Sequence, residues 1–405
     1  MRVVLIGAGV AGGVIARGLR GLPGIELAMV ERVSADDHAS AGNGLNIGPN
    51  ALLALDRVLP AMAAELRGAS LPWTRWRAAL IDGTPIYETK LAEIGAGPGI
   101  RIRWSELYRI ARAHVADLTR YDHRCVDVEV APGAAGKARV TLERVSRDGS
   151  EVIDDIDLVI ACDGRYSVVR ELSCGAPTVR HLGVANFRTL TDDADTTGID
   201  DLEQWYNGPN RLFAFRLPDR RLYVTGTFPI DAGREIPDHQ KTAAFLRALY
   251  RPADGRVDPR CEFLVDVACR QLNALHWSRF QDIDTRFHDS SGRLLFVGDS
   301  AHAMAPTLGQ GATQAIEDGC ALVGLFSAWG ASGNPNVGAL TAEFDRLRRD
   351  RIGFVKQLSW DASTALLAGS DAIAANRSYA TPAYRAKLRR LYTELGFAAA
   401  AHHAA

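Results

Sequence analysis

The sequence of 405 residues lacks several features that would assign it to a class at once. No apolar run approaches the roughly 20 residues that a membrane-spanning helix requires. The formal net charge is −1, so no excess of positive charge favours nucleic acid or an anionic membrane as a partner. No signal-peptide pattern is present, because Met1 and Arg2 lead directly into a strand-like segment. We therefore expect a cytoplasmic protein.

Cysteines are few and scattered, and no two of them have C-x-x-C spacing. This pattern favours free thiols in a reducing compartment over disulfides or zinc, and we expect no metal site. Neither G-x-S-x-G nor H-E-x-x-H occurs, so the common signatures of serine hydrolases and zinc proteases are missing. The six cysteines are Cys125, Cys162, Cys174, Cys261, Cys269 and Cys320.

The first pattern that indicates chemistry is a short β-branched run, residues 2–6, followed directly by GAGVAG. These glycines follow a strand and open a helix, and a second apolar run ends on Glu31. Gly7 permits a tight turn, Gly9 lets the backbone approach a pyrophosphate, and Gly12 lets the helix pack on the sheet. Glu31 has the position of the acid that accepts hydrogen bonds from an adenosine ribose. The unit predicts a dinucleotide site and leaves open whether the dinucleotide is a flavin or a nicotinamide.

A second strand–loop–helix unit lies late in the chain, at residues 294–323. The apolar run Leu294–Val297 is typical of a buried strand, and Asp299 follows it closely. A carboxylate at the end of a parallel strand suits a ribose hydroxyl, because it accepts hydrogen bonds. Gly309 and Gly311 keep side chains away from the start of the next helix, so its positive end can meet an electron-rich ligand.

A third motif, DLVIACDGRYSVVR at residues 157–170, again places an acid after a buried-strand pattern. With GAGVAG and Glu31 before it and GDSAHAMAPTLGQGATQAIEDG at 298–319 after it, the chain resembles the flavoprotein aromatic hydroxylases. These are the class A monooxygenases of the p-hydroxybenzoate hydroxylase type. The resemblance implies the α/β class, with a Rossmann-like FAD-binding domain and an inserted antiparallel-sheet substrate domain.

The resemblance also implies where one FAD binds. Asp163 would line the pyrophosphate cleft, Asp299 would hold ribityl or ribose hydroxyls, and the helix start at 309–312 would lie beside the isoalloxazine. The cofactor-binding residues expected in this way are Gly7, Gly9, Gly12, Glu31, Arg32, Gly44, Leu45, Arg103, Asp163, Asp299, Gly309, Gly311 and Ala312.

The sequence departs from the family at one of these positions. Where relatives usually have an arginine, three residues before the leucine of WSEL, this chain has Trp104. Arg103 lies next to that position and Arg101 lies further away, so Arg103 is the better candidate for the contact with the FAD diphosphate.

A reaction also follows from the resemblance. NADH or NADPH would bind transiently and reduce the flavin, and O₂ would then give a C4a-hydroperoxyflavin that hydroxylates an electron-rich ring. A small aromatic or N-heteroaromatic compound, such as a phenol or a hydroxypyridine carboxylate, is the expected substrate. The protein would be a monomer or a homodimer.

The sequence pattern changes in the middle of the chain, residues 172–287, where aromatic, strand-like segments alternate with polar turns. It predicts an antiparallel sheet that covers the flavin. In two of the segments Arg211 and Phe213 share one face and Tyr223 and Thr225 share one face, and the pattern leaves open which faces point inward. A helix is expected at Thr242–Tyr250. The strand-like segments are Val184–Leu190, 204–206, Arg211–Leu217, Arg221–Phe228 and Phe263–Cys269.

NRLFAF with RRLYVTG at 210–226, and AANRS at 374–378, are similar to the hydroxypyridine-carboxylate monooxygenases within this family. That similarity implies that Arg211 pairs with a substrate carboxylate and that Tyr223 hydrogen-bonds a ring substituent. Pro306, in the loop after the late strand, is the third catalytic candidate.

The motifs divide the chain into four parts: 1–171, the first part of the FAD domain with interleaved segments; 172–287, mainly the substrate sheet; 288–397, the second part of the FAD domain with carboxyl-terminal helices; and a disordered tail at 398–405. A long charged helix is expected within Gly338–Leu367. Three other functions remain compatible with a dinucleotide motif: a flavin oxidase or reductase, an NAD(P)-dependent dehydrogenase and a non-catalytic FAD sensor.

Overall fold

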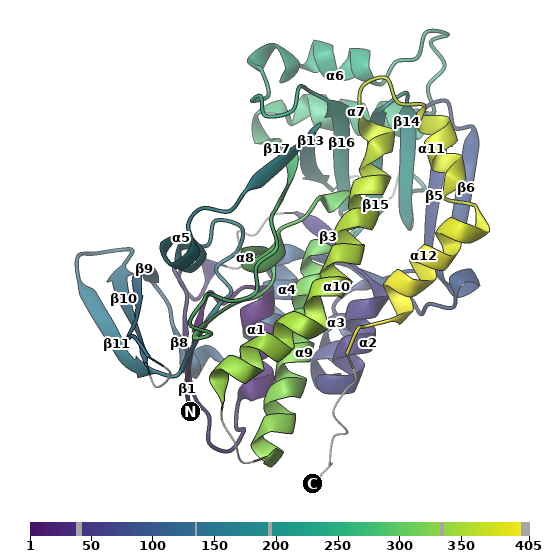
Figure 1. Ribbon diagram of the computed structural model, residues 1–405. Coiled ribbons are helices and arrows are strands. Elements are labelled where there is room, and N and C mark those ends of the chain that lie inside the picture. The colour runs from purple at the N-terminus through teal and green to yellow at the C-terminus, as the bar shows by residue number, and fades with distance from the viewer. Residues whose placement is uncertain (38–42, 134–135, 193–196, 333–335, 398–405) are drawn as a thin grey trace.

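A five-stranded parallel sheet forms the centre of the nucleotide-binding half (Figure 1). The computed structural model describes residues 1–37, 43–133, 136–192, 197–332 and 336–397, so the tail predicted to be disordered lies outside it. The strand order is β18-β12-β1-β2-β8, and every pair is parallel. The strands are β1 (Arg2–Ile6), β2 (Glu26–Val30), β8 (Thr119–Arg120), β12 (Leu158–Ala161) and β18 (Leu294–Phe296).

This order brings the three sequence motifs together. Strand β1 lies between β2 and β12, and β18 lies beyond β12, so the loops that leave β1, β12 and β18 meet at one edge of the sheet. Strand β12 is fully buried, as expected for a parallel strand covered on both faces. The sheet confirms the α/β class, and the predicted strand–loop–helix units are present.

Helices cover this sheet, and two of them cross closely. A Cβ placed on Gly319 of α9 would lie 2.6 Å from Val14 of α1, and one on Gly18 would lie 2.3 Å from Val323. Glycine therefore lets α1 and α9 pack directly against each other. The helices of this half are α1 (Val10–Leu19), α2 (Pro49–Val58), α3 (Pro60–Gly68), α4 (Trp104–Arg112), α5 (Val168–Cys174), α8 (Asp299–His302), α9 (Gly311–Ser332) and α10 (Val337–Ser363).

The substrate half is built on a seven-stranded sheet of order β17-β13-β16-β15-β14-β5-β6. Its last two strands come from early in the chain, and β5 pairs in parallel with β14. The sheet therefore extends beyond residues 172–287, the part of the chain in which we expected most of it. The strands are β5 (Arg75–Leu80), β6 (Pro85–Lys90), β13 (Val179–Thr191), β14 (Leu202–Asn207), β15 (Asn210–Arg216), β16 (Leu222–Pro229) and β17 (His276–Ile283).

One face of this sheet is covered by α6 (Ala243–Leu249) and α7 (Pro259–Arg270), which lie at the top of Figure 1. The expected helix at Thr242–Tyr250 is confirmed. The expected strand at Phe263–Cys269 is wrong, because this segment belongs to α7. Asp258 caps the helix by accepting a hydrogen bond from the Arg260 N–H at 2.8 Å, and a proline occupies the first turn.

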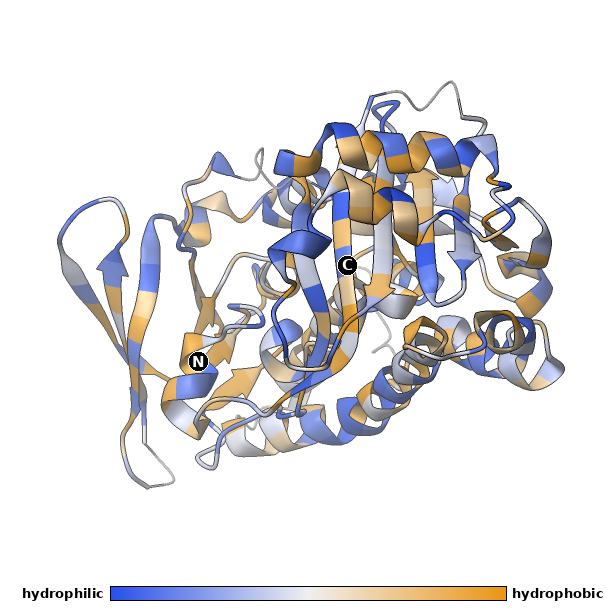
Figure 2. Cartoon of the chain, turned by 90° about the horizontal axis from the view of Figure 1, so that it is seen from above, coloured by the Kyte–Doolittle hydropathy of each residue, from blue (hydrophilic) through white to orange (hydrophobic). Residues whose placement is uncertain are grey.

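Two small sheets and a helical carboxyl-terminal segment complete the fold. The sheet β9–β10–β11 stands apart from the body of the molecule, and its strands alternate between hydrophobic and hydrophilic residues (Figure 2). The sheet β3–β7–β4 is built from early parts of the chain, and residues of β3 and β4 line one of the cavities of the site. The bounds are β3 (Gly44–Ile47), β4 (Leu71–Trp73), β7 (Gly99–Arg103), β9 (His123–Val130), β10 (Ala138–Arg144), β11 (Ser150–Ile156), α11 (Ala372–Ser378) and α12 (Pro382–Thr393).

Candidate active site

A cavity of about 670 Å³ opens where the loops after β1, β2, β12 and β18 meet. This is the switch point of the sheet, where the chain leaves neighbouring strands in opposite directions, and nucleotides bind at such points. The predicted residues among its lining are Gly7, Gly9, Glu31, Arg32, Asp163, Asp299, Gly311 and Ala312. We call it the cofactor cavity.

Close backbone contacts leave no room for a side chain at two of the three glycines of the first turn. Gly7 has φ +103°, and a Cβ there would lie 2.4 Å from the Cys162 carbonyl oxygen. A Cβ on Gly12 would lie 2.0 Å from the Gly7 carbonyl oxygen, so Gly12 packs in the turn and does not line the cavity. At Gly9 the nearest atom would be 3.9 Å away, so this residue leaves open surface for a ligand. Gly7 therefore forms the tight turn that the sequence predicted, Gly12 packs against that turn, and the contact of Gly9 with a pyrophosphate stays a prediction.

Glu31 is held rigidly at the end of β2. It is buried, and its carboxylate accepts hydrogen bonds from the N–H groups of Ala8 at 2.7 Å and Val33 at 3.2 Å. These contacts fix the carboxylate at the cavity wall, beside Arg32. The position suits a ribose hydroxyl pair.

Asp163 and Asp299 follow β12 and β18. One oxygen of Asp163 accepts a hydrogen bond from the Val169 N–H at 3.3 Å, and the other is buried with no partner among the described residues. Burial raises the pKa of Asp163, and hydrogen bonds from Ser167 and Val169 oppose that rise. An unpartnered buried oxygen is costly, so this carboxylate is suited to a hydrogen-bond donor from a bound ligand. Asp299 lines the same cavity at the start of α8.

The structure places Arg103 elsewhere than we expected. Its guanidinium donates to Asp219 at 3.2 Å, and it is not among the residues that line the cofactor cavity. Arg101 is buried against backbone, where it donates to the Pro72 carbonyl at 2.8 Å. Both arginines tie β7 to neighbouring segments instead of facing the cavity.

Arg112 lines the cavity, and the sequence patterns did not single it out. It donates to the Ala8 carbonyl at 2.9 Å and lies 3.8 Å from Glu31, while one terminal nitrogen is buried without a partner among the described residues. Trp104, Tyr108 and Arg112 follow one another at four-residue intervals on one face of α4, and all three line the cavity. The sequence signal that could have identified Arg112 is this four-residue spacing, which places it on the same helix face as Trp104 and Tyr108.

A second cavity of about 720 Å³ lies between the seven-stranded sheet and the loop that precedes α9, and we call it the substrate cavity. Six residues line both cavities and therefore make them neighbours: Trp104, Arg165, Tyr166, Asp299, Gly311 and Ala312. Gly44, Leu45, Pro306 and Gly309 line the substrate cavity only, so each of these predicted residues is also part of the combined site. Gly309 has φ +63°, which ends the turn before α9.

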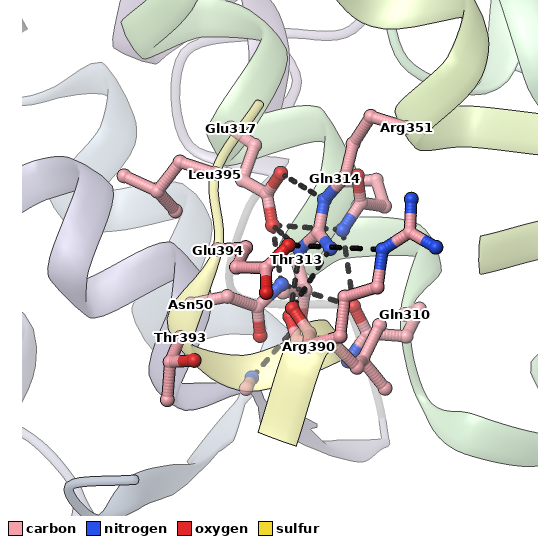
Figure 3. Close-up of polar contacts among 12 residues, drawn as sticks. Asn50, Gln310, Thr313, Gln314, Glu317, Arg351, Arg390, Thr393, Glu394 and Leu395 are labelled. Atoms are coloured by element: carbon pink, nitrogen blue, oxygen red, sulfur yellow. Dashed lines mark hydrogen bonds and ion pairs between the residues drawn. The ribbon is translucent and has the colours of Figure 1, made fainter. Parts of the chain in front are cut away.

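Beneath this turn, a buried polar network fixes the start of α9 (Figure 3). Glu317 accepts from Arg351 at 2.9 Å and from Gln314 at 2.8 Å, and Asn50 of α2 donates both to Glu317 and to Gln310. Burial alone would raise the pKa of Glu317, but the nearby guanidinium groups lower it. Helices α2, α9 and α10 all contribute side chains to this one cluster of hydrogen bonds and charges. The cluster therefore holds the start of α9 in place beside the cavity.

The face of the substrate sheet that points into the cavity is set by strand register. Arg211 pairs with Thr227, Phe213 with Thr225, and Phe215 with Tyr223. All six side chains line the cavity, while the alternate residues of β15 and β16 pack under α6 and α7. The faces that the sequence left open are thus assigned.

Arg211 and Tyr223 are both buried on this face. The Nε atom of Arg211 has no hydrogen-bond partner among the described residues, and the guanidinium lies 5.8 Å from the Phe213 ring. Tyr223 packs 4.8 Å from Phe215. Burial raises the pKa of Tyr223, and the charges of Arg188 and Arg211 oppose that rise.

Known proteins identify the class of this site. A family model for an FAD binding domain matches residues 132–334. The 2-heptyl-3-hydroxy-4(1H)-quinolone synthase of Pseudomonas aeruginosa strain UCBPP-PA14 is 30% identical over 374 residues, which cover 89% of this chain and 88% of the relative. The chain belongs to the FAD-dependent aromatic monooxygenases.

One further relative and one solved structure are similar to this chain, and the structure shows the shared fold. The 6-hydroxynicotinate 3-monooxygenase of Pseudomonas fluorescens is 25% identical over 379 residues, covering 89% of this chain and 90% of the relative. Klebsiella pneumoniae HpxO, solved with FAD and uric acid, has the same fold, with a TM-score of 0.75, 20% identity and coverage of 96% of this chain and 93% of that chain. The family match thus makes this chain an FAD-dependent monooxygenase of the aromatic-hydroxylase type.

The cofactor cavity fits FAD on its own geometry. Gly9 leaves backbone open, Asp163 and Arg112 have unpartnered polar atoms, and the start of α9 faces the junction of the two cavities. Within the described residues, no cluster of three or more metal-ligating side chains occurs, and no helix is long and apolar enough to cross a membrane.

Proposed function

We propose that this monooxygenase hydroxylates a small ring that carries a carboxylate, of the hydroxypyridine- or hydroxybenzene-carboxylate type. The observation that supports this best is Arg211, a buried guanidinium that faces the substrate cavity with an unpartnered Nε. A carboxylate would satisfy it through a charge-assisted, bidentate contact. Without an anion, a buried guanidinium is costly.

Tyr223 is the group that orients the ring. On the cavity face, the Phe213–Thr225 pair separates the Phe215–Tyr223 pair from the Arg211–Thr227 pair, so Tyr223 and Arg211 would face the same bound ring. The Tyr223 hydroxyl would hydrogen-bond a ring hydroxyl or ring nitrogen, and Phe213 and Phe215 would exclude water from the ring face. Pro306 closes the opposite wall, beside the start of α9.

For the cofactor we propose that Glu31 and Asp299 hold ribose or ribityl hydroxyls and that Asp163 lies in the pyrophosphate cleft. Arg112, in place of Arg103, would neutralise the diphosphate, because it lines the cavity and has a free terminal nitrogen. FAD reduced by NADH or NADPH supplies the activation of O₂. The protein would position the substrate, exclude water from the site and place the positive end of the α9 helix dipole beside the flavin ring system.

A substrate screen tests this function. Phenols, anilines and hydroxypyridines, each with and without a carboxylate, would be added to the FAD-loaded enzyme while NADH or NADPH oxidation is followed. We expect carboxylated hydroxy-aromatics to stimulate oxidation and to yield a product that contains one oxygen atom from ¹⁸O₂. Stimulation by uncharged rings alone, or oxidation without oxygen incorporation, would overturn the proposal.

The cytoplasm remains our proposal for its location. All six cysteines are free and four of them are buried, as expected for a reducing compartment. A monomer or a homodimer remains the expected assembly.

A further inference from the structure

We propose that the substrate carries two anionic groups on one ring, and that Arg188 binds the second group while Arg211 binds the first. This inference rests on the proposed function and extends it by one residue that the sequence patterns did not single out. It makes the substrate class an aromatic ring with two carboxylates, or with a carboxylate and an ionised hydroxyl.

Strand pairing places the two arginines on opposite sides of β16. Arg188 on β13 pairs with Thr225, and Arg211 on β15 pairs with Thr227. Because β13 and β15 are each one strand away from β16, their backbones are roughly 10 Å apart across the sheet. Both side chains line the same cavity of about 720 Å³, so both guanidinium groups can contact one bound molecule.

The side chains between the arginines are neutral and polar. Thr225, Thr227 and Tyr223 of β16 lie on the cavity face of the strand that separates them. Burial raises the pKa of Tyr223, and the charge of Arg188, which lines the same cavity, is the largest influence that opposes this rise. Among the described residues of the cavity lining, none of those on the sheet is a carboxylate that could neutralise the two guanidinium groups.

The charges of the cavity lining are strongly unequal. Among the described residues that line it, Asp299 is the one carboxylate, and it is shared with the cofactor cavity. Of the other two arginines of the lining, Arg165 is shared with the cofactor cavity, and Arg279 is already bound to Glu235 at 2.5 Å and to backbone carbonyls. Arg188 and Arg211 have no ion pair with any described residue, and the Nε of each is buried without a partner.

This imbalance favours a dianion over a monoanion. A buried or half-buried charge without a partner costs free energy, and a bound anion removes that cost. One carboxylate satisfies Arg211 and leaves Arg188 unpaired on the same wall. Two anionic groups satisfy both.

Matched pairs of ligands test the inference by binding alone. Isophthalate and terephthalate would be compared with their monomethyl esters, which keep the ring and one carboxylate but lose the second charge. Affinity would be measured from the change in flavin absorbance when the FAD-loaded enzyme is titrated. We expect at least one dicarboxylate to bind about tenfold more tightly than its monoester.

Variants then assign the difference to Arg188. Arg188→Met should remove the preference for the dicarboxylate and leave the affinity for the monoester unchanged, and Arg188→Lys should restore part of the preference. Arg180→Met is the matched control, because Arg180 lies on the same strand, pairs with Asp282 and does not line the cavity. FAD content and melting temperature show that each variant is folded.

The outcomes separate this inference from the proposed function. Equal affinity for diacid and monoester, or an equal loss of both in Arg188→Met, would overturn the role of Arg188 while carboxylate binding at Arg211 stands. If neither ligand binds, carboxylate recognition itself is wrong, and the proposed function and this inference fall together.

Discussion

The cofactor cavity and the substrate cavity differ most clearly in their charged side chains. Among the described residues, the cofactor cavity has carboxylates and arginines in equal number, whereas the substrate cavity has Asp299 against four arginines. A dinucleotide needs acceptors for its hydroxyl groups and cations for its phosphates, so a balanced lining suits it. The substrate cavity lacks that balance even though Arg279 is paired with Glu235, and in the function that we propose an anionic substrate supplies the missing negative charge.

The two cavities also differ in what fixes their residues. On the cofactor side the backbone makes the decisive contacts, through glycines that allow no side chain and helix ends that face the ligand. On the substrate side the decisive feature is the face of a sheet, where register brings distant side chains into one row. Substitutions on the cofactor side should therefore affect stability or FAD binding, whereas substitutions on the substrate side should affect substrate binding.

The largest effect should follow Gly12→Ala. Its Cβ would lie 2.0 Å from the Gly7 carbonyl oxygen, a backbone atom that cannot move cheaply. In a helix, alanine is about 1 kcal/mol more stabilising than glycine. The clash should cost more than this, so we expect the free energy of unfolding to fall by roughly 3 kcal/mol in total. Denaturant unfolding of the apoprotein measures this change.

Gly9→Ala is the control, because space for a Cβ is available at Gly9. It should weaken FAD binding and leave the free energy of unfolding unchanged. Equal stability of the two variants would contradict the steric role of Gly12.

Arg211→Met should have the largest effect on the substrate side. Loss of a charged hydrogen bond should weaken carboxylate binding by roughly 1.5–3 kcal/mol, with FAD content unchanged. Titration with an inhibitor or substrate carboxylate measures it. Arg216→Met is the control, because Arg216 lies on the same strand but points to the other face. A similar loss in both variants would show that general charge, and not the pocket face, governs binding.

Arg112→Met should weaken FAD binding by roughly 1.5–3 kcal/mol if its free nitrogen meets the diphosphate. Arg103→Met should leave FAD affinity unchanged, because Arg103 pairs with Asp219 outside the cavity. Quenching of flavin fluorescence on reconstitution of the apoprotein measures both. The reverse order of effects would return the diphosphate contact to Arg103.

The smallest effect on binding should follow Tyr223→Phe, which removes one hydroxyl, worth about 1 kcal/mol, and keeps the ring that packs on Phe215. Orientation should suffer more than occupancy, because small displacements of reacting atoms are costly. We expect more hydrogen peroxide per NAD(P)H oxidised. An unchanged ratio of product to NAD(P)H, with unchanged affinity, would leave Tyr223 a packing residue only.

The positions that local sterics dictate could be predicted from the sequence. Gly7 forms the predicted tight turn because its φ of +103° and its closeness to the Cys162 carbonyl leave no room for a side chain. Glu31 and Asp299 lie where acids at strand ends must lie once the strands are parallel. The segment Phe263–Cys269 was misjudged because its apolar residues suit a strand as well as a helix, and the cap at Asp258 decided the outcome.

The remaining features depend on pairings between distant segments. Strands β5 and β6 joined the substrate sheet through a parallel contact with β14 that no local pattern encodes. Arg188 was missed for the same reason, since only the register of β13 with β16 brings it to the cavity. Arg112 could not be recognised from the motif at Trp104, because it lies two turns further along the face of α4 that lines the cavity.

The most direct test of the account compares a hydroxy-aromatic carboxylate with its methyl ester under ¹⁸O₂. The pair would be taken from the compounds that stimulate NAD(P)H oxidation, and labelled product per NAD(P)H would be measured for the wild type and Arg211→Met at equal FAD content. The account predicts one labelled oxygen in the product of the acid, far less product from the ester, and a preference that disappears in Arg211→Met. Equal hydroxylation of acid and ester by the wild type would contradict the claim that the substrate supplies the missing negative charge.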